Sequence, residues 1–203
     1  MTRILPSDQR DTQRSRTTVK VGVTGHRFLS DQDGIAAQID LALRRIMEAF
    51  GSDGLTVISE LAIGADQLVA SRALALPGTQ LIVPLPLPLS QYLEDFKTPS
   101  LKRSFTELFH RASAIRIMPP APTRDDAYHA AGVYVVEHSD VMITIWDGQP
   151  ARGRGGTAEI VALARERGLP LAWIHAANHT ADSGAIPARG DRATSITFER
   201  FPS

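Results

Sequence analysis

Hydrophobic positions along the chain alternate between the spacing of a strand and the spacing of a helix. Residues 19–24 (V-K-V-G-V-T) form a short β-branched run that ends at a glycine, which is typical of a strand followed by a turn. From 34 to 50, apolar side chains recur at helical spacing as one stripe: Ile35, Ile39, Leu43, Ile46, Met47 and Phe50. The chain therefore begins its regular structure with a strand and an amphipathic helix.

The alternation continues along most of the chain. We expect further strands at 55–59, 80–84, 114–118, 141–146 and 171–174, and helices at 65–76, 101–112, 127–138 and 157–167. The sequence L-P-L-P at 85–88 excludes a helix there, and Ser90 has a side chain suited to cap the next one. Beyond 178 the chain is polar and interrupted by glycine and proline, with one edge strand expected at 195–198.

Several of these strands are continuous apolar runs, which a parallel sheet covered on both faces requires. We predict an α/β fold with a Rossmann-like, doubly wound and mainly parallel sheet. A length of 203 residues suits a single domain. Its bounds are predicted as 19–177, after a flexible polar leader at 1–18 and before a polar C-terminal tail at 178–203.

Composition narrows the classes of function. The chain has no cysteine, which excludes disulfides, thiolate metal sites and cysteine nucleophiles. Lys+Arg and Asp+Glu both total 22, and this balance argues against strong binding of nucleic acid. The histidines are scattered without ligand spacing, so we expect no metal site. We also expect no cofactor. No apolar run is long enough for a membrane span, and a cytoplasmic location is expected.

The strongest candidate site is the stretch 147–159 (D-G-Q-P-A-R-G-R-G-G-T-A-E), which joins a strand to a helix. Gly155, Gly156 and Thr157 are expected to hold a phosphate, because glycine lets a ligand approach the backbone and a helix N-terminus offers N–H groups to an anion. Arg154 adds positive charge at the rim, and Asp147 opens the loop. The simpler alternative is a tight turn in which glycine serves geometry alone.

A second candidate follows the first strand at Gly25, His26 and Arg27. The first strand-to-helix loop of a doubly wound fold usually binds phosphate or nucleotide. His26 and Arg27 are candidates to contact phosphate or ribose, although they could equally order a surface turn. The patterns G-x-G-x-x-G and G-x-x-x-x-G-K-[ST] are absent, which disfavours a nicotinamide dehydrogenase and a P-loop NTPase.

A third candidate follows the second strand. Glu60, at the strand's carboxyl end, could accept hydrogen bonds from ribose hydroxyls or could be merely solvated. Gly64 and Ala65 are small enough to let a ligand approach, and Asp66 is either a ligand contact or an ordinary acid of a first helical turn.

Glu159 is the candidate catalytic carboxylate. An acid beside a bound phosphoribosyl group could stabilise oxocarbenium character or position a water molecule. The alternative is that the helix dipole alone favours an acid in the first helical turn.

Together, the segments V-T-G-H-R, E-L-A-I-G-A-D and W-D-G-Q-P-A-R-G-R-G-G-T-A-E resemble the SLOG superfamily, which includes the LOG phosphoribohydrolases and the DprA recombination mediators. The resemblance covers about 19–174 and implies a Rossmann-like nucleotide-binding protein that assembles as a dimer or larger homo-oligomer. It matches 155–157 to the phosphate-binding Gly-Gly-Thr and 64–66 to the small-residue loop.

The hydrolase pattern P-G-G-x-G-T-x-x-E differs from this chain, which has one residue fewer between Thr157 and the acid. On a helix, the side chain of Glu159 therefore points about 100° away from the direction that the glutamate of the hydrolase pattern takes. We therefore expect a sensor or binding module for a nucleotide-type ligand. The alternative is a LOG-like phosphoribohydrolase that cleaves the N-glycosidic bond of a nucleoside monophosphate.

Overall fold

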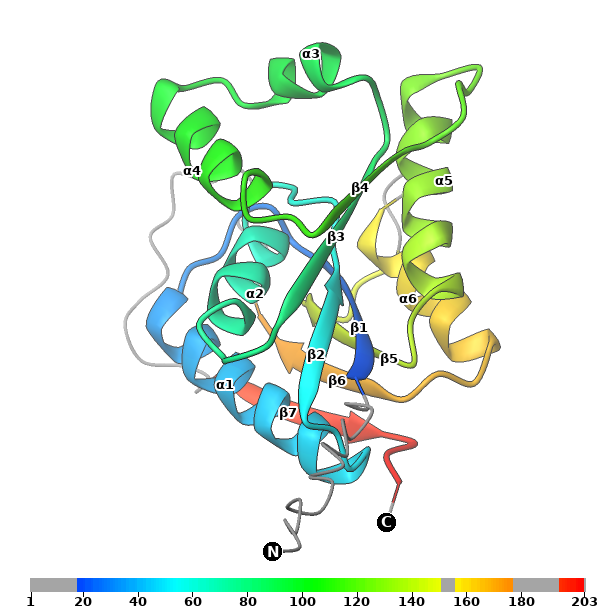
Figure 1. Ribbon diagram of the computed structural model, residues 1–203. Coiled ribbons are helices and arrows are strands. Elements are labelled where there is room, and N and C mark those ends of the chain that lie inside the picture. Colours follow the sequence, from blue (N-terminus) through cyan, green and yellow to red (C-terminus); the bar gives the residue numbers. More distant parts are fainter. Residues whose placement is uncertain (1–17, 151–155, 177–193, 203) are drawn as a thin grey trace, which may run out of the picture.

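The computed structural model describes residues 18–150, 156–176 and 194–202, which build a single sheet with helices on both faces (Figure 1). The strands are β1 (Thr18–Gly25), β2 (Gly54–Ile58), β3 (Gln80–Leu85), β4 (Ala114–Ile117), β5 (Val141–Trp146), β6 (Leu171–His175) and β7 (Ser195–Glu199). The helices are α1 (Gln32–Ala49), α2 (Ala65–Ala73), α3 (Leu89–Tyr92), the 3₁₀ turn η1 (Leu93–Asp95), α4 (Pro99–Phe109), α5 (Arg124–Glu137) and α6 (Thr157–Glu166).

The seven strands lie in the order β4-β3-β2-β1-β5-β6-β7, and all neighbouring pairs are parallel except β6 and β7. The chain moves outward from β1 to β4 and then returns to place β5 on the other side of β1. The strand order therefore reverses between β1 and β5. This arrangement confirms the predicted single-domain, Rossmann-like and mainly parallel α/β fold.

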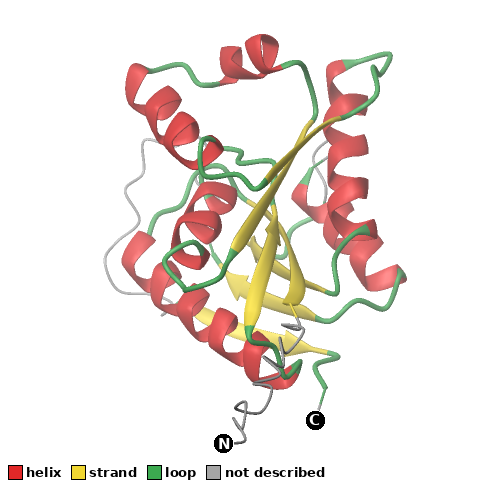
Figure 2. Cartoon of the chain, viewed as in Figure 1, coloured by secondary structure: helices red, strands yellow, loops and turns green. Residues whose placement is uncertain are grey.

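Helices α1, α2 and α4 cover one face of the sheet, and α5 and α6 cover the other (Figures 1 and 2). Every residue of β2 and of β5 is buried. A strand with both faces covered has no solvent side, and this explains why its sequence is a continuous apolar run.

The ends of the helices depart from the predicted bounds where a cap sets the first turn. Helix α5 begins at Arg124, three residues before the predicted start, because Thr123 caps it. The Asp126 N–H donates to the Thr123 hydroxyl at 3.1 Å, and that hydroxyl donates to the Asp126 carboxylate at 2.8 Å. The expected cap at Ser90 is wrong, since α3 begins at Leu89 directly after Pro88.

The first and last strands along the chain, β1 and β7, can be compared with the predicted leader and tail. Thr18, which we placed in the leader, is the first residue of β1 and pairs with Gly54. The edge strand expected in the polar tail is confirmed as β7, and Arg165 of α6 holds it through hydrogen bonds of 3.0 and 2.7 Å to Glu199. The remainder of the predicted leader and residues 177–193 lie outside the described residues.

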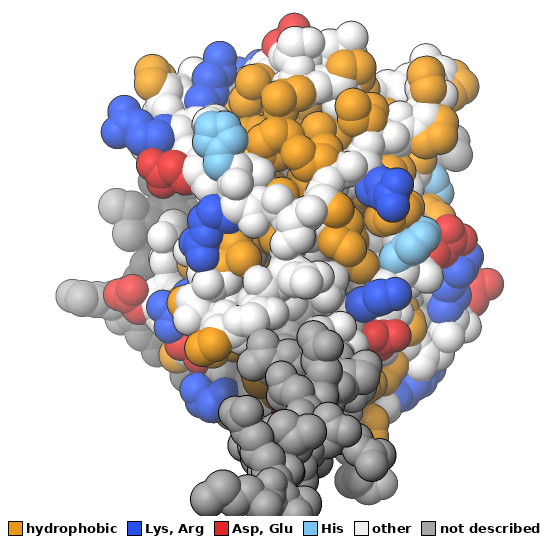
Figure 3. Space-filling view, viewed as in Figure 1, with side chains coloured by type: hydrophobic (Ala, Val, Ile, Leu, Met, Phe, Trp, Pro, Cys, Tyr) orange, Lys and Arg blue, Asp and Glu red, His pale blue; other side chains and the backbone are white. Residues whose placement is uncertain are grey.

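The opposite edge of the sheet, strand β4, is largely open to solvent. Ile115 and Ile117 are 45% and 62% exposed, and Figure 3 shows apolar side chains gathered around this strand. Within the described ranges, no helix is long and apolar enough to cross a membrane.

Candidate functional site

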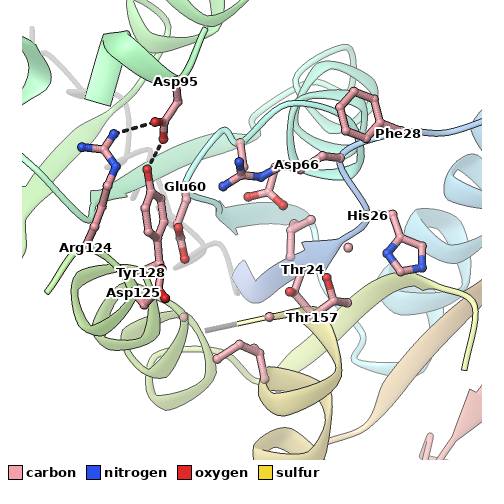
Figure 4. Close-up of a pocket in the computed structure, with 17 residues that line it drawn as sticks. Thr24, His26, Phe28, Glu60, Asp66, Asp95, Arg124, Asp125, Tyr128 and Thr157 are labelled. Carbon is pink, nitrogen blue, oxygen red and sulfur yellow. Dashed lines mark hydrogen bonds and ion pairs between the residues drawn. The ribbon is translucent and has the colours of Figure 1, made fainter. Parts of the chain in front are cut away.

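A cavity of about 610 Å³ opens at the carboxyl ends of β1 and β2, beside the point where the strand order reverses. Doubly wound sheets bind their ligands in this place. The walls come from β1 and its loop, the loop after β2, the start of α2, η1, α5 and the start of α6 (Figure 4). The side chains that Figure 4 labels are Thr24, His26, Phe28, Glu60, Asp66, Asp95, Arg124, Asp125, Tyr128 and Thr157.

The N-terminus of α6 forms one wall of this cavity. Gly156 caps the helix, and its carbonyl oxygen accepts hydrogen bonds from the N–H groups of Glu159 and Ile160. Gly156, Thr157 and Ile160 all line the cavity. The first N–H groups of a helix have no partner within the helix, and its dipole favours an anion at this end. The described part of the glycine motif thus meets the cavity, whereas Arg154 and Gly155 lie outside the described residues.

His26 is 9% exposed and connects the loops around the cavity. Its Nε2 accepts a 3.0 Å hydrogen bond from the N–H of Asp147, whose carboxylate oxygen lies 3.2 Å from the same nitrogen. Its own N–H donates to the carbonyl of Ile145 at 2.9 Å, and its carbonyl accepts from Ala65 at 3.0 Å. His26 therefore orders the turn after β1, and its ring also borders the cavity.

The small residues of the first two loops allow those loops to pack against each other. A Cβ added at Gly64, whose φ is +89°, would lie 2.4 Å from the Arg27 carbonyl oxygen and 2.5 Å from that of His26. A Cβ added at Gly25 would lie 2.5 Å from the Cβ of Ala65. Packing thus requires small residues here. Gly25 lines the cavity, and Gly64 and Ala65 lie behind that wall.

Asp66 is a buried carboxyl in the first turn of α2. It accepts a 2.9 Å hydrogen bond from the Ser59 hydroxyl and further bonds from the N–H groups of Ala62 and Glu60. Burial raises the pKa of Asp66 to about 6, although these hydrogen bonds and the charge of Arg27 act in the opposite direction.

Glu60 lies beside Asp66 at the carboxyl end of β2. Burial raises the pKa of Glu60 well above its ordinary value, the charge of Asp66 adds to this effect, and the charge of Arg27 opposes it. Both carboxyls line the cavity, so the wall at β2 carries two acids that hold their protons more tightly than exposed acids do.

The α5 wall was missed by the sequence prediction. Arg124 and the hydroxyl of Tyr128 both donate to the carboxylate of Asp95 in η1. The guanidinium carbons of Arg27 and Arg124 lie 5.7 and 5.9 Å from the centre of the Tyr128 ring. Arg124, Tyr128 and Gly132 are spaced by four, so they share one helical face, and that spacing was the available signal.

Glu159 does not line the cavity. Its Oε1 lies 3.4 Å from Nδ1 of His129 on α5. The helix itself explains the placement, because two residues turn the side chain by about 200° from Thr157, whereas three bring Ile160 back to the same side. A catalytic role for Glu159 stays a prediction that this geometry does not favour.

One wall of the cavity is the N-terminus of α6, and another, at β2 and η1, carries acidic side chains. Among the residues that the structure describes, no three or more His, Cys, Asp or Glu side chains are grouped to hold a metal ion. A scan against protein-family models finds no match, and a search of curated proteins finds no significantly similar sequence. The relation to the SLOG superfamily therefore stays a prediction from the three sequence motifs.

Proposed function

We propose that this protein binds a nucleotide or nucleotide-derived ligand in the cavity and acts as a sensor or binding module. The ligand's phosphate contacts the N–H groups of Gly156 and Thr157 at the start of α6. The observation that carries the proposal is the opening of a glycine-capped helix N-terminus into a cavity at the reversal of the strand order.

The groups around that helix end suit an anion. Thr24 and Thr157 bring hydroxyl donors to the cavity, and Arg27 brings a positive charge. Arg27 forms no ion pair with the described residues, in contrast to Arg124, which is paired with Asp95 at 2.5 Å. A guanidinium that is not engaged in an ion pair can form hydrogen bonds to a phosphate.

The cavity also offers a contact for a flat apolar group of the ligand. Phe28 lines the cavity and is 48% exposed, which is unusual for a large apolar side chain. An exposed aromatic ring offers a nucleobase a surface to stack on. The volume of the cavity falls within the usual range for small-molecule sites.

Calorimetric titration with AMP, GMP, CMP and UMP tests the proposal. Gly156 has φ −76° and ψ 160°, which valine adopts without strain, so Gly156→Val obstructs the helix end without distorting the backbone. We expect at least a tenfold loss of affinity, about 1.4 kcal/mol. Ser100→Val, in the exposed first turn of α4, is the matched control and should bind like the wild type. Unchanged affinity in folded Gly156→Val would refute the proposed phosphate site.

Three expectations accompany this proposal. Nucleic acid should bind weakly, because the chain carries equal numbers of basic and acidic residues. The chain should form a dimer or larger homo-oligomer, for which Ile115 and Ile117 offer exposed apolar surface, and sedimentation velocity measures this. A cytoplasmic location also stays a prediction.

A further inference from the structure

We propose that Glu60 binds the ribose hydroxyls of the ligand, so that the cavity selects ribosyl phosphates over 2′-deoxyribosyl phosphates. This inference rests on the proposed phosphate site at α6. It adds the class of sugar that the cavity recognises.

The hydrogen bonds of the cavity's carboxyls single out Glu60. Asp66 accepts from Ser59 and from two backbone N–H groups, and Asp95 accepts from Tyr128 and Arg124. Asp125 is exposed to solvent in the first turn of α5. Glu60 is only partly exposed, and its carboxyl accepts no hydrogen bond from the described residues. The carboxyl of Glu60 faces the cavity with its capacity to accept hydrogen bonds unused, so a ligand in the cavity would supply the donors.

The sheet places Glu60 within reach of a sugar whose phosphate lies at α6. Glu60 follows β2 and Thr157 follows β5, with β1 between them. Two strand spacings separate β2 from β5, about 10 Å. Figure 4 shows Thr24 and Thr157 close together beside α6, with Glu60 on the side of the cavity toward α5 and Tyr128. A ligand anchored at α6 would therefore extend past the end of β1 toward Glu60.

Glycine at residue 132 lets α5 pack closely against Ile160 of α6 beside Glu60. A Cβ added at Gly132 would lie 2.5 Å from Cδ1 of Ile160 and 3.8 Å from Oε1 of Glu60. The carboxyl oxygen of Glu60 thus lies beside the contact between α5 and α6, where Gly132 and Ile160 both line the cavity.

Hydroxyl groups are the partners that suit this carboxyl in either protonation state. Glu60 interacts electrostatically with Asp66 on α2, Arg27 after β1 and Tyr92 on α3, and Tyr128 on α5 lines the same cavity. Burial and the charge of Asp66 raise the pKa of Glu60 above its ordinary value. A hydroxyl donates to a carboxylate and can also accept from a protonated acid, whereas an exocyclic amino group only donates. A vicinal diol offers two such hydroxyls to one carboxyl.

The experiment measures the affinity of each ribonucleoside 5′-monophosphate and its 2′-deoxy counterpart by calorimetry, with inorganic phosphate as the minimal anion. The variants are Glu60→Ala, which removes the hydrogen-bonding group, and Glu60→Gln, which keeps its shape. Glu107→Gln is the matched control, since it changes an exposed carboxyl on α4 that does not line the cavity. Circular dichroism verifies that each variant is folded.

We expect the wild type and Glu107→Gln to prefer the ribonucleotide at least tenfold. Glu60→Ala should lose this preference while its affinity for inorganic phosphate stays within twofold, and Glu60→Gln should be intermediate. Equal affinities of the wild type for the ribo and deoxy forms, or a preference that survives in Glu60→Ala, would overturn the inference and leave the phosphate site standing. No binding of any phosphate compound by the wild type would overturn the phosphate site and this inference together.

Discussion

The Ser59 hydroxyl donates a 2.9 Å hydrogen bond to Oδ2 of Asp66, and this bond joins the end of β2 to the first turn of α2 behind the cavity. The same hydroxyl accepts a hydrogen bond from the N–H of Leu61 at 3.1 Å. Leu61 has a φ of +59°, a value uncommon for a residue other than glycine. The Ser59 side chain thus holds the loop that carries Glu60 in a fixed conformation.

The raised pKa of Asp66 predicts that folding stability falls as the pH rises. Its pKa is about 6 in the folded protein against an ordinary value of 3.8, so the folded state binds more protons between these values. The stabilisation is complete below about pH 4 and is lost as the pH rises through 6, a difference of about 3 kcal/mol. Urea unfolding of the wild type and Asp66→Asn between pH 4 and 7 measures it.

Asp66→Asn should show a flatter dependence of the unfolding free energy on pH, because asparagine does not titrate. Glu60 changes the pH dependence of stability in the same direction, since its pKa is also raised. The double variant Asp66→Asn and Glu60→Gln should therefore show a still flatter dependence of the unfolding free energy on pH. Identical slopes for the wild type and Asp66→Asn would show that this carboxyl is not buried as described.

Gly64 should tolerate alanine less well than Gly51 does. Both glycines have positive φ, +89° and +57°, so alanine is strained at either position. A Cβ at Gly51 meets nothing within 4 Å, whereas a Cβ at Gly64 meets the backbone of His26 and Arg27. We expect Gly51→Ala to lower the unfolding free energy by about 1 kcal/mol and Gly64→Ala by at least about 2 kcal/mol more. Equal losses in chemical denaturation would contradict the close packing of these loops.

The pattern of the sequence was sufficient for the fold but for only part of the site. Continuous apolar strands such as 141–146 demand cover on both faces, so the parallel sheet and the cavity's place at its carboxyl edge followed directly. Asp95 gave no signal, because it lies in an irregular segment and acquires its role only when Tyr128 and Arg124 fold against it. Gly64 was expected to let a ligand approach, and spacing alone does not reveal that the neighbouring loop also requires a glycine there.

Phe28 should distinguish a nucleotide from a simple sugar phosphate. If its exposed ring stacks on the base, Phe28→Ala should lower the affinity for nucleoside monophosphates about five- to tenfold, which corresponds to a stacking contact of about 1 kcal/mol. The affinity for ribose 5-phosphate, which has no base, should stay unchanged. Leu41→Ala, which removes another exposed apolar side chain, from α1, is the control and should have no effect. A similar loss for ribose 5-phosphate would mean that Phe28 shapes the loop rather than contacting a base.

The last prediction separates the sensor from the hydrolase. Cleavage of the N-glycosidic bond requires a carboxylate near the anomeric carbon as positive charge develops there. Glu159 lies next to His129 and is turned about 200° around α6 from Thr157, away from a sugar anchored at that helix end. We therefore expect no appreciable free base from AMP, GMP, CMP or UMP over hours at micromolar protein, as measured by chromatography. Base that accumulates with the wild type and stops with Glu159→Gln would establish the hydrolase with Glu159 as its acid. Base that persists in Glu159→Gln but stops with Glu60→Gln would instead assign the chemistry to the carboxyl that lines the cavity.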